Sequence, residues 1–245
     1  QRDAINAIGE MQPAQVEGAE PLLLTFVAEG TEPGLRMAAL YALGHVGSEA
    51  SLETLADAAE AAHFTMEPSG ANEAYIQLLK KLAADGRTET VAKAAKNLQK
   101  QAAKAGALQS REAALEILLS LSEPKEATKL LLSALKDKDR NYRNAALDYA
   151  SAFADEAAYI EIAKAMMKSK PEVKVDILNW LGREAKDKQK HPILKGLMIR
   201  FDLPFASLLR DELNTDDFAV RQAAVWTMVK LGDKGFIPTL ANLLT

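Results

Sequence analysis

The chain has 245 residues, of which 48% are hydrophobic and 26% are charged, and it contains no cysteine. A chain of this length and composition can bury a sizeable core, and the lack of cysteine excludes a disulfide scaffold, thiolate zinc sites and cysteine nucleophiles. The formal net charge of −4 argues against a dedicated nucleic-acid binder. The sequence shows no signal peptide and no membrane span. The compartment is either the cytoplasm or, if a signal peptide has been removed, the periplasm or the cell exterior.

Along the chain, apolar residues recur with helical spacing, and the alternation typical of strands is missing. One helical pattern returns seven times. Around Arg36, apolar residues follow three, four and seven positions later, at Ala39, Leu40 and Leu43. The anchors of this pattern, in chain order, are Arg2, Arg36, Asn72, Arg111, Arg143, Lys174 and Arg221. The long last interval predicts an irregular insertion at 186–213 that holds a further helix within 191–201.

A further apolar helix is expected between successive anchored helices and after the last one. These intervening helices fall within 18–30, 51–64, 88–103, 125–136, 155–168 and 236–244. Two positions after the anchor the residue is alanine in six copies and Asp176 in the other, and small residues there let a neighbouring helix approach closely. We therefore expect an all-α fold, a right-handed α-α superhelix of about seven stacked helical hairpins, as a single domain over 1–245.

The segments EPGLRMAALYALGHVG (32–47) and DDFAVRQAAVWTMVKLGDKGFIPTLANLL (216–244) resemble HEAT repeats. The resemblance extends over nearly the whole chain and is weakest at 1–11, 70–83 and 186–213. It implies an α-solenoid of the HEAT-like or armadillo type. Some bacterial proteins similar to this one attach HEAT repeats to a sugar-acting or oxidoreductase domain. This domain arrangement in similar proteins, together with a first anchored helix that lacks its partner helix, implies that the chain is a fragment of a longer protein.

Three inter-helix turns place an acid shortly before an arginine: Glu32–Arg36, Asp139–Arg143 and Asp216–Arg221. We expect each acid to cap its helix and each arginine to fasten neighbouring repeats, the alternative being a row of arginines for anionic ligands. The helix expected over 87–105 carries a lysine stripe, which we interpret as a solvated face rather than a site for phosphate or an acidic membrane. The stripe consists of Lys93, Lys96, Lys100 and Lys104. Acidic residues prevail in 1–86 and basic ones in 87–210, an asymmetry that could steer an association.

No motif indicates catalysis. The three histidines, His45, His63 and His191, have no second metal ligand at helical spacing. The sequence has no glycine-rich phosphate loop and no nucleophile elbow. Acidic residues are plentiful, but no pair is distinctive enough to suggest acid–base chemistry. We therefore predict no catalytic residue, no cofactor and no metal.

The candidate binding surface is the exposed face of the anchored helices, which are the second helices of their hairpins. Positions five and nine after the anchor point away from the apolar face of the helix. The residues that we predict to contact a partner are Tyr41, His45, Gln77, Lys81, Glu116, Asp148, Asn179, Arg183, Trp226 and Lys230. Trp226 is expected outside as an aromatic anchor, whereas Trp180 is expected in the core. The alternative is an ordinary solvated face.

These observations favour a non-catalytic protein–protein interaction or scaffold module. Its partner would be another protein or another domain of the same polypeptide, with no nucleic acid, no membrane span and no metal. One alternative is a HEAT-like enzyme such as a DNA alkylation-repair glycosylase, which the acidic charge disfavours. HEAT-like bilin lyases are another group of enzymes with this type of repeat, but the chain contains no residue pattern that indicates their activity. A further alternative is an accessory domain of a larger secreted sugar-acting enzyme.

Overall fold

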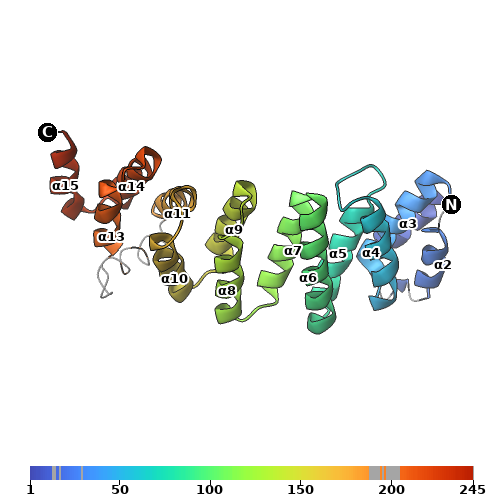
Figure 1. The fold of residues 1–245 in the computed structure, drawn as a ribbon. Helices are drawn as coiled ribbons and strands as arrows, with labels where there is room; N and C mark the ends of the chain where they lie inside the picture. Colours follow the sequence, from blue (N-terminus) through green and yellow to red (C-terminus); the bar gives the residue numbers. More distant parts are fainter. Residues whose placement is uncertain are drawn as a thin grey trace. The chain divides into compact units, whose positions relative to one another are not determined.

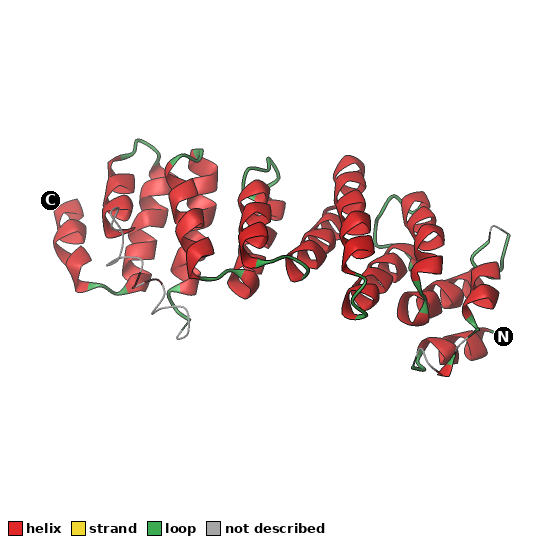
Figure 2. Cartoon of the chain, turned by 90° about the horizontal axis from the view of Figure 1, so that it is seen from below, coloured by secondary structure: helices red, strands yellow, loops and turns green. Residues whose placement is uncertain are grey.

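The structure is a computed structural model that describes residues 1–12, 15–16, 18–28, 30–187, 194, 196 and 205–244. Within these residues the regular secondary structure is entirely helical (Figures 1 and 2). Of the helix predicted within 191–201, the described residues include 194 and 196 alone. His191 lies outside the described residues. No described helix is long and apolar enough to cross a membrane.

Every predicted anchor lies in the first turn of a helix. The seven anchored helices are α1 (Arg2–Gly9), α3 (Pro33–Val46), α5 (Ala71–Ala84), α7 (Leu108–Ser120), α9 (Arg140–Phe153), α11 (Pro171–Glu184) and α14 (Phe218–Leu231). Between and after them lie α2 (Glu20–Thr25), α4 (Leu52–Ala61), α6 (Thr88–Ala105), α8 (Pro124–Ala134), α10 (Glu156–Met167), α13 (Phe205–Asp211) and α15 (Ile237–Ala241). Short 3-10 turns occupy Glu49–Ser51, Glu212–Asn214, Lys234–Phe236 and Asn242–Leu244. The structure is the all-α solenoid of helical hairpins that the sequence predicts.

The chain divides into two compact units, Gln1–Leu121 and Ser122–Thr245. In a solenoid each repeat contacts only its neighbours, so contacts are local and the chain has no single central core. The expectation of one repeat domain over 1–245 stays a prediction.

In the first unit, α2, α4 and α6 pack against α3, α5 and α7, and the anchored helices α1, α3, α5 and α7 stack in order. Leucines such as Leu43 and Leu78 fill the interior and are fully buried. The stack is tight because the facing residues are small. A Cβ added to Gly44 would lie 3.0 Å from the carbonyl oxygen of Ala74, one of the alanines two positions after an anchor. Close approach thus explains the small residues at these positions.

In the second unit, α8, α10 and α13 pack against α9, α11 and α14, and the anchored helices again stack in order. Trp180 is fully buried, as predicted, and its ring stacks on Tyr159 with centroids 4.8 Å apart. Its Nε1 donates to Ser151 Oγ at 3.0 Å, and Ser151 Oγ donates to Glu184 at 2.8 Å. The Tyr159 hydroxyl donates to the other Glu184 oxygen. Burial, together with this carboxylate, raises the pKa of Tyr159 well above its usual value.

Candidate functional site: the exposed face of the anchored helices

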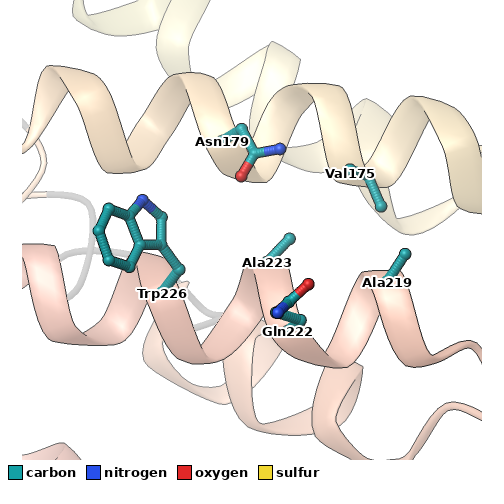
Figure 3. A pocket seen from close by; sticks show the side chains of 6 residues that line it. All are labelled: Val175, Asn179, Ala219, Gln222, Ala223 and Trp226. Atoms are coloured by element: carbon teal, nitrogen blue, oxygen red, sulfur yellow. The ribbon is translucent and has the colours of Figure 1, made fainter.

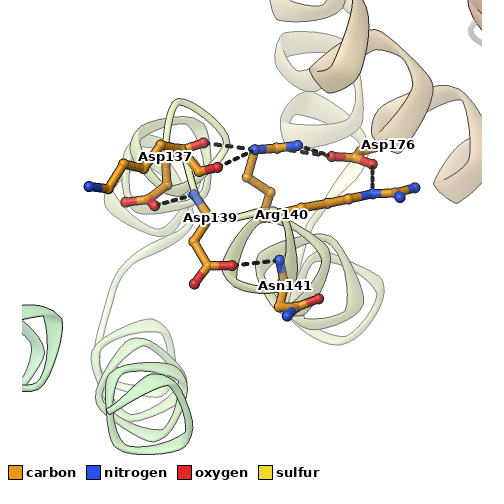
Figure 4. A network of polar contacts seen from close by, with 7 residues as sticks. Asp137, Asp139, Arg140, Asn141 and Asp176 are labelled. Atoms are coloured by element: carbon orange, nitrogen blue, oxygen red, sulfur yellow. Dashed lines mark hydrogen bonds and ion pairs between the residues drawn. The ribbon is translucent and has the colours of Figure 1, made fainter. Parts of the chain in front are cut away.

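A buried ion pair between Arg143 and Asp176 joins α9 to α11, and Figure 4 shows the polar network around Asp176. Arg143 donates to the Asp176 carboxylate from Nε at 2.9 Å and from Nη2 at 2.7 Å, and Arg140 Nε adds a bond of 3.0 Å. The side chains of Arg143 and Asp176 are 4% and 1% exposed. Arg143 Nη1 donates to the carbonyl oxygens of Asp137 and Lys138 in the preceding turn. Arg143 is therefore structural and fastens two repeats.

The turn acids cap helices as predicted, with one correction. The Glu32 carboxylate accepts bonds from two backbone N–H groups in the first turn of α3, which hold its pKa below the usual value. Asp139 accepts one such bond at the start of α9. The prediction of Asp216 as the cap of α14 is wrong. Asp217 directly precedes that helix, and its carboxylate accepts a bond from the backbone N–H of Val220 at 3.0 Å.

The other two turn arginines bind backbone within their own turns. Arg36 Nε donates to the carbonyl oxygen of Val27 at 3.0 Å, and Arg221 Nη1 donates to that of Thr215 at 2.6 Å. Each acceptor lies a few residues before the helix that carries the arginine. The guanidinium group therefore donates a hydrogen bond to a backbone carbonyl oxygen in the turn between two helices.

The prediction that each turn arginine joins neighbouring repeats is confirmed for Arg143. Hydrogen bonds from Ser69 lower the pKa of the Glu67 carboxyl, before α5 of the next repeat, and Arg36 also lies close enough to lower it. For Arg221 the joining of repeats stays a prediction.

The structure places the ten predicted contact residues on the surface of the anchored helices, five in each unit. Tyr41, Gln77, Asp148, Arg183 and Trp226 are exposed, and His45, Lys81, Glu116, Asn179 and Lys230 are half-buried. This placement follows from helical geometry, because positions five and nine after the anchor lie away from the buried face. Whether these residues bind a partner stays a prediction.

In the first unit, several of these side chains bridge neighbouring repeats. The Tyr41 hydroxyl on α3 donates to the Glu10 carboxylate that follows α1, and the ring of His45 lies 4.3 Å from that of Tyr41. Lys80 on α5 pairs with Glu116 on α7 at 2.8 Å. The Tyr41–Glu10 and Lys80–Glu116 contacts cross between repeats, whereas the Tyr41–His45 contact lies within α3. Part of the predicted row therefore already joins adjacent anchored helices.

The second unit holds a similar bridge and one aromatic contact. Arg183 on α11 pairs with Asp148 on α9 at 3.0 Å, and both side chains are exposed. On α14, Lys230 Nζ lies 3.8 Å from the centroid of the Trp226 ring, within the range of a cation–π interaction. Trp226 is 48% exposed, which is unusual for so large an aromatic side chain.

A groove of about 310 Å³ runs between α11 and α14, and it contains two of the predicted contact residues, Asn179 and Trp226 (Figure 3). The residues that line it are Val175 and Asn179 from α11, and Ala219, Gln222, Ala223 and Trp226 from α14. Trp226 stands at one end of the groove, and the small side chains of Val175 and Ala219 lie at the other. The groove exists because the small side chains of Ala219 and Ala223 on α14 leave space beside α11. The larger side chain of Trp226 closes this space at one end.

The chemistry of the groove is mixed. Val175, Ala219 and Ala223 supply apolar surface, and the amides of Asn179 and Gln222 each offer a donor and an acceptor. Neither amide side chain has a hydrogen-bond partner among the residues that the structure describes. The sequence placed Asn179 and Trp226 on the surface, but it gave no sign that Val175, Ala219, Gln222 and Ala223 would lie beside them.

Among the described residues, no group of three or more histidine, aspartate and glutamate side chains is placed to hold a metal ion. The four lysines predicted as a stripe on α6 are all exposed.

Residues 35–61 match the family model of the PBS lyase HEAT-like repeat. The match covers α3, which carries the Arg36 anchor, together with α4. This hairpin is a HEAT-like repeat. The other six anchored helices lie outside the matched segment, and all of them but α1 share the same spacing of apolar residues after the anchor. The crystal structure of an engineered protein is similar over 95% of this chain and 74% of its own, at 13% sequence identity and a TM-score of 0.36. A search of curated protein sequences found no significant match.

Proposed function

We propose that this HEAT-like repeat protein is a non-catalytic interaction module that binds an extended segment of another protein or of another domain of its own polypeptide. The observation that carries the proposal is the groove between α11 and α14, where the exposed Trp226 lies beside two amide side chains, those of Asn179 and Gln222, that have no hydrogen-bond partner in the part of the chain that the structure describes. HEAT-like scaffolds are suited to this role, because stacked hairpins present a continuous surface without a deep catalytic cavity.

The groove fits a peptide in chemical terms. An extended peptide offers an N–H and a C=O group at each residue, and the amides of Asn179 and Gln222 can each bond to both kinds of group. The apolar floor of Val175, Ala219 and Ala223 leaves room for one apolar side chain. Covering Trp226 would bury a large, rigid aromatic surface, the type of contact that contributes most to binding energy at interfaces.

The other predicted contact residues would extend the surface and contribute less. Asp148 and Arg183 already satisfy each other in an exposed ion pair, and Glu116 already pairs with Lys80. A partner would have to compete with these contacts, and exposed pairs contribute little in any case. We therefore assign the leading role to Trp226, with Asn179 beside it.

The experiment is a selection of displayed random peptides on the immobilised full chain, followed by titration of the selected peptides against two variants. Trp226→Ala removes the end of the groove, and we expect it to weaken binding at least about tenfold, as for an aromatic hot spot. Val229→Ala is the matched control, because Val229 is exposed on the same helix but does not line the groove. Peptides that bind both variants as well as the parent chain would contradict the proposal.

A further inference from the structure

Two outer helices of the first unit, α4 and α6, carry stripes of opposite charge. The acidic stripe on α4 consists of Glu53, Asp57 and Glu60, and the basic stripe on α6 consists of Lys93, Lys96, Lys100 and Lys104. All seven side chains are exposed. None of them forms an ion pair or a side-chain hydrogen bond with another residue that the structure describes. Their charges are therefore available to a partner.

Both stripes point directly away from the body of the unit. At about 100° per residue, the three acids of α4 lie on the side of the helix opposite Leu55 and Ala59, which are fully buried. The four lysines of α6 likewise lie opposite Val91 and Leu98, which are fully buried too. The outer side of this unit thus presents an acidic ridge and a basic ridge.

The two ridges begin at the same level. Glu49, in the turn before α4, pairs with Arg87 Nε at 3.4 Å and accepts a hydrogen bond from Thr90 Oγ1 at 3.3 Å. Arg87 and Thr90 stand at the start of α6, so α4 and α6 start side by side. Glu53 lies four residues after Glu49, and Lys93 lies three residues after Thr90. The acids and the lysines therefore stand at matching heights along two neighbouring helices.

We propose that this face binds a second copy of the chain in an isologous dimer. A two-fold axis that is parallel to α4 and α6 and lies in front of this face, midway between the two ridges, brings the two copies face to face with the positions of their ridges exchanged. The acidic ridge of each copy then faces the basic ridge of the other, with Glu53 at the level of Lys93, Asp57 at that of Lys96 and Glu60 at that of Lys100. The contact is made twice by symmetry, which is the arrangement that a self-complementary patch allows.

The acidic ridge also distinguishes this partner from a polyanion. A nucleic acid or an anionic membrane would be attracted to the four lysines but repelled by Glu53, Asp57 and Glu60 beside them. A second copy satisfies both ridges at once. Ala103, which is exposed between Lys100 and Lys104 in the sequence, adds little bulk beside the basic ridge.

The test is sedimentation equilibrium of the full chain with paired charge reversals. In about 20 mM NaCl we expect a monomer–dimer equilibrium that weakens at least about tenfold in about 300 mM NaCl, because salt screens exposed charges. The variant E53K/D57K/E60K and the variant K93E/K96E/K100E should each stay monomeric. An equal mixture of the two should form a heterodimer, because the reversed ridges attract each other again. Circular dichroism checks that both variants keep their helices.

Two results would overturn the proposal. The first is a parent chain that stays monomeric in low salt, and retention of that monomer on heparin through the α6 lysines would assign the stripe to a polyanion instead. The second is a dimer that neither reversal disturbs, which would place self-association on another surface. Restored association in the mixture cannot arise from misfolding, so it separates the proposed contact from a general loss of structure.

Discussion

Replacing Asp176 by alanine tests how the second unit is held together. The substitution leaves no steric problem, because alanine occupies the equivalent position in six other repeats. It does remove the partner of the Arg143 guanidinium, which is only 4% exposed, and with it the two bonds from Arg143. Stranding one member of a buried ion pair costs about 3–5 kcal/mol, so we expect the free energy of unfolding to fall by that amount.

A double variant at positions 143 and 176 distinguishes two effects, the cost of leaving one buried charge without a partner and the loss of the attraction between the two charges. Arg143→Met alone should also cost about 3–5 kcal/mol, because it leaves Asp176 buried without its main partner. Together, Arg143→Met and Asp176→Ala remove both charges, and the double variant should be more stable than the sum of the single losses predicts, by at least about 2 kcal/mol. Denaturant titrations followed by circular dichroism give all four free energies.

An exposed ion pair in the same unit is the matched control. Asp148 and Arg183 join the same two helices, α9 and α11, but their side chains are 68% and 52% exposed. Asp148→Ala should therefore cost no more than about 1 kcal/mol. If Asp176→Ala costs as little as Asp148→Ala, or if the two substitutions at positions 143 and 176 are additive, the buried pair does not fasten the repeats as argued.

Three further predictions concern packing, a buried hydrogen bond and a cap. Gly44→Val should lower stability by about 1–3 kcal/mol in thermal melts, because a side chain there meets the backbone of Ala74. Tyr159→Phe should lower it by about 1–3 kcal/mol in the same assay, because the buried Glu184 carboxylate loses a donor. Glu32→Gln should lower the melting temperature at neutral pH. The folded-state pKa of Glu32 is depressed, so the stability that its charge gives is present above the unfolded-state pKa and lost as pH falls through the folded-state pKa. Melts of the parent and the variant should therefore converge in acid, and a gap that persists there would contradict the capping role.

The repeat frame was predictable because it depends on local spacing. The seven anchors and the burial of Trp180 both follow from apolar residues that recur within one helix. The role of Asp176 had a sequence signal, since it is the one residue that interrupts a column of alanines, but the interruption does not reveal Arg143 as its partner. Asp217 caps α14 in place of Asp216 because the two acids are adjacent, and a shift of the helix start by one residue exchanges their positions.

The candidate site was predictable only in part. Helical geometry placed Asn179 and Trp226 at the surface, but the groove depends on how α14 packs on α11, two helices separated in sequence by an insertion. Surface contacts such as Tyr41 with Glu10 also depend on the stacking of separate repeats. A pattern within one helix carries no information on such contacts. The sequence therefore predicted a uniform row of contact residues, whereas the structure has ion pairs and hydrogen bonds between repeats, and a groove beside Trp226.

The most direct test of the proposed function is the NMR signal of the two tryptophan indole N–H groups during titration with a selected peptide. The chain has two tryptophans, and their surroundings differ. Trp180 is fully buried and donates to Ser151, whereas Trp226 is exposed at the end of the groove. We predict that the Trp226 resonance shifts in proportion to bound peptide while the Trp180 resonance stays in place. A bound peptide that leaves the Trp226 resonance unchanged would contradict the assignment of the groove as the binding site.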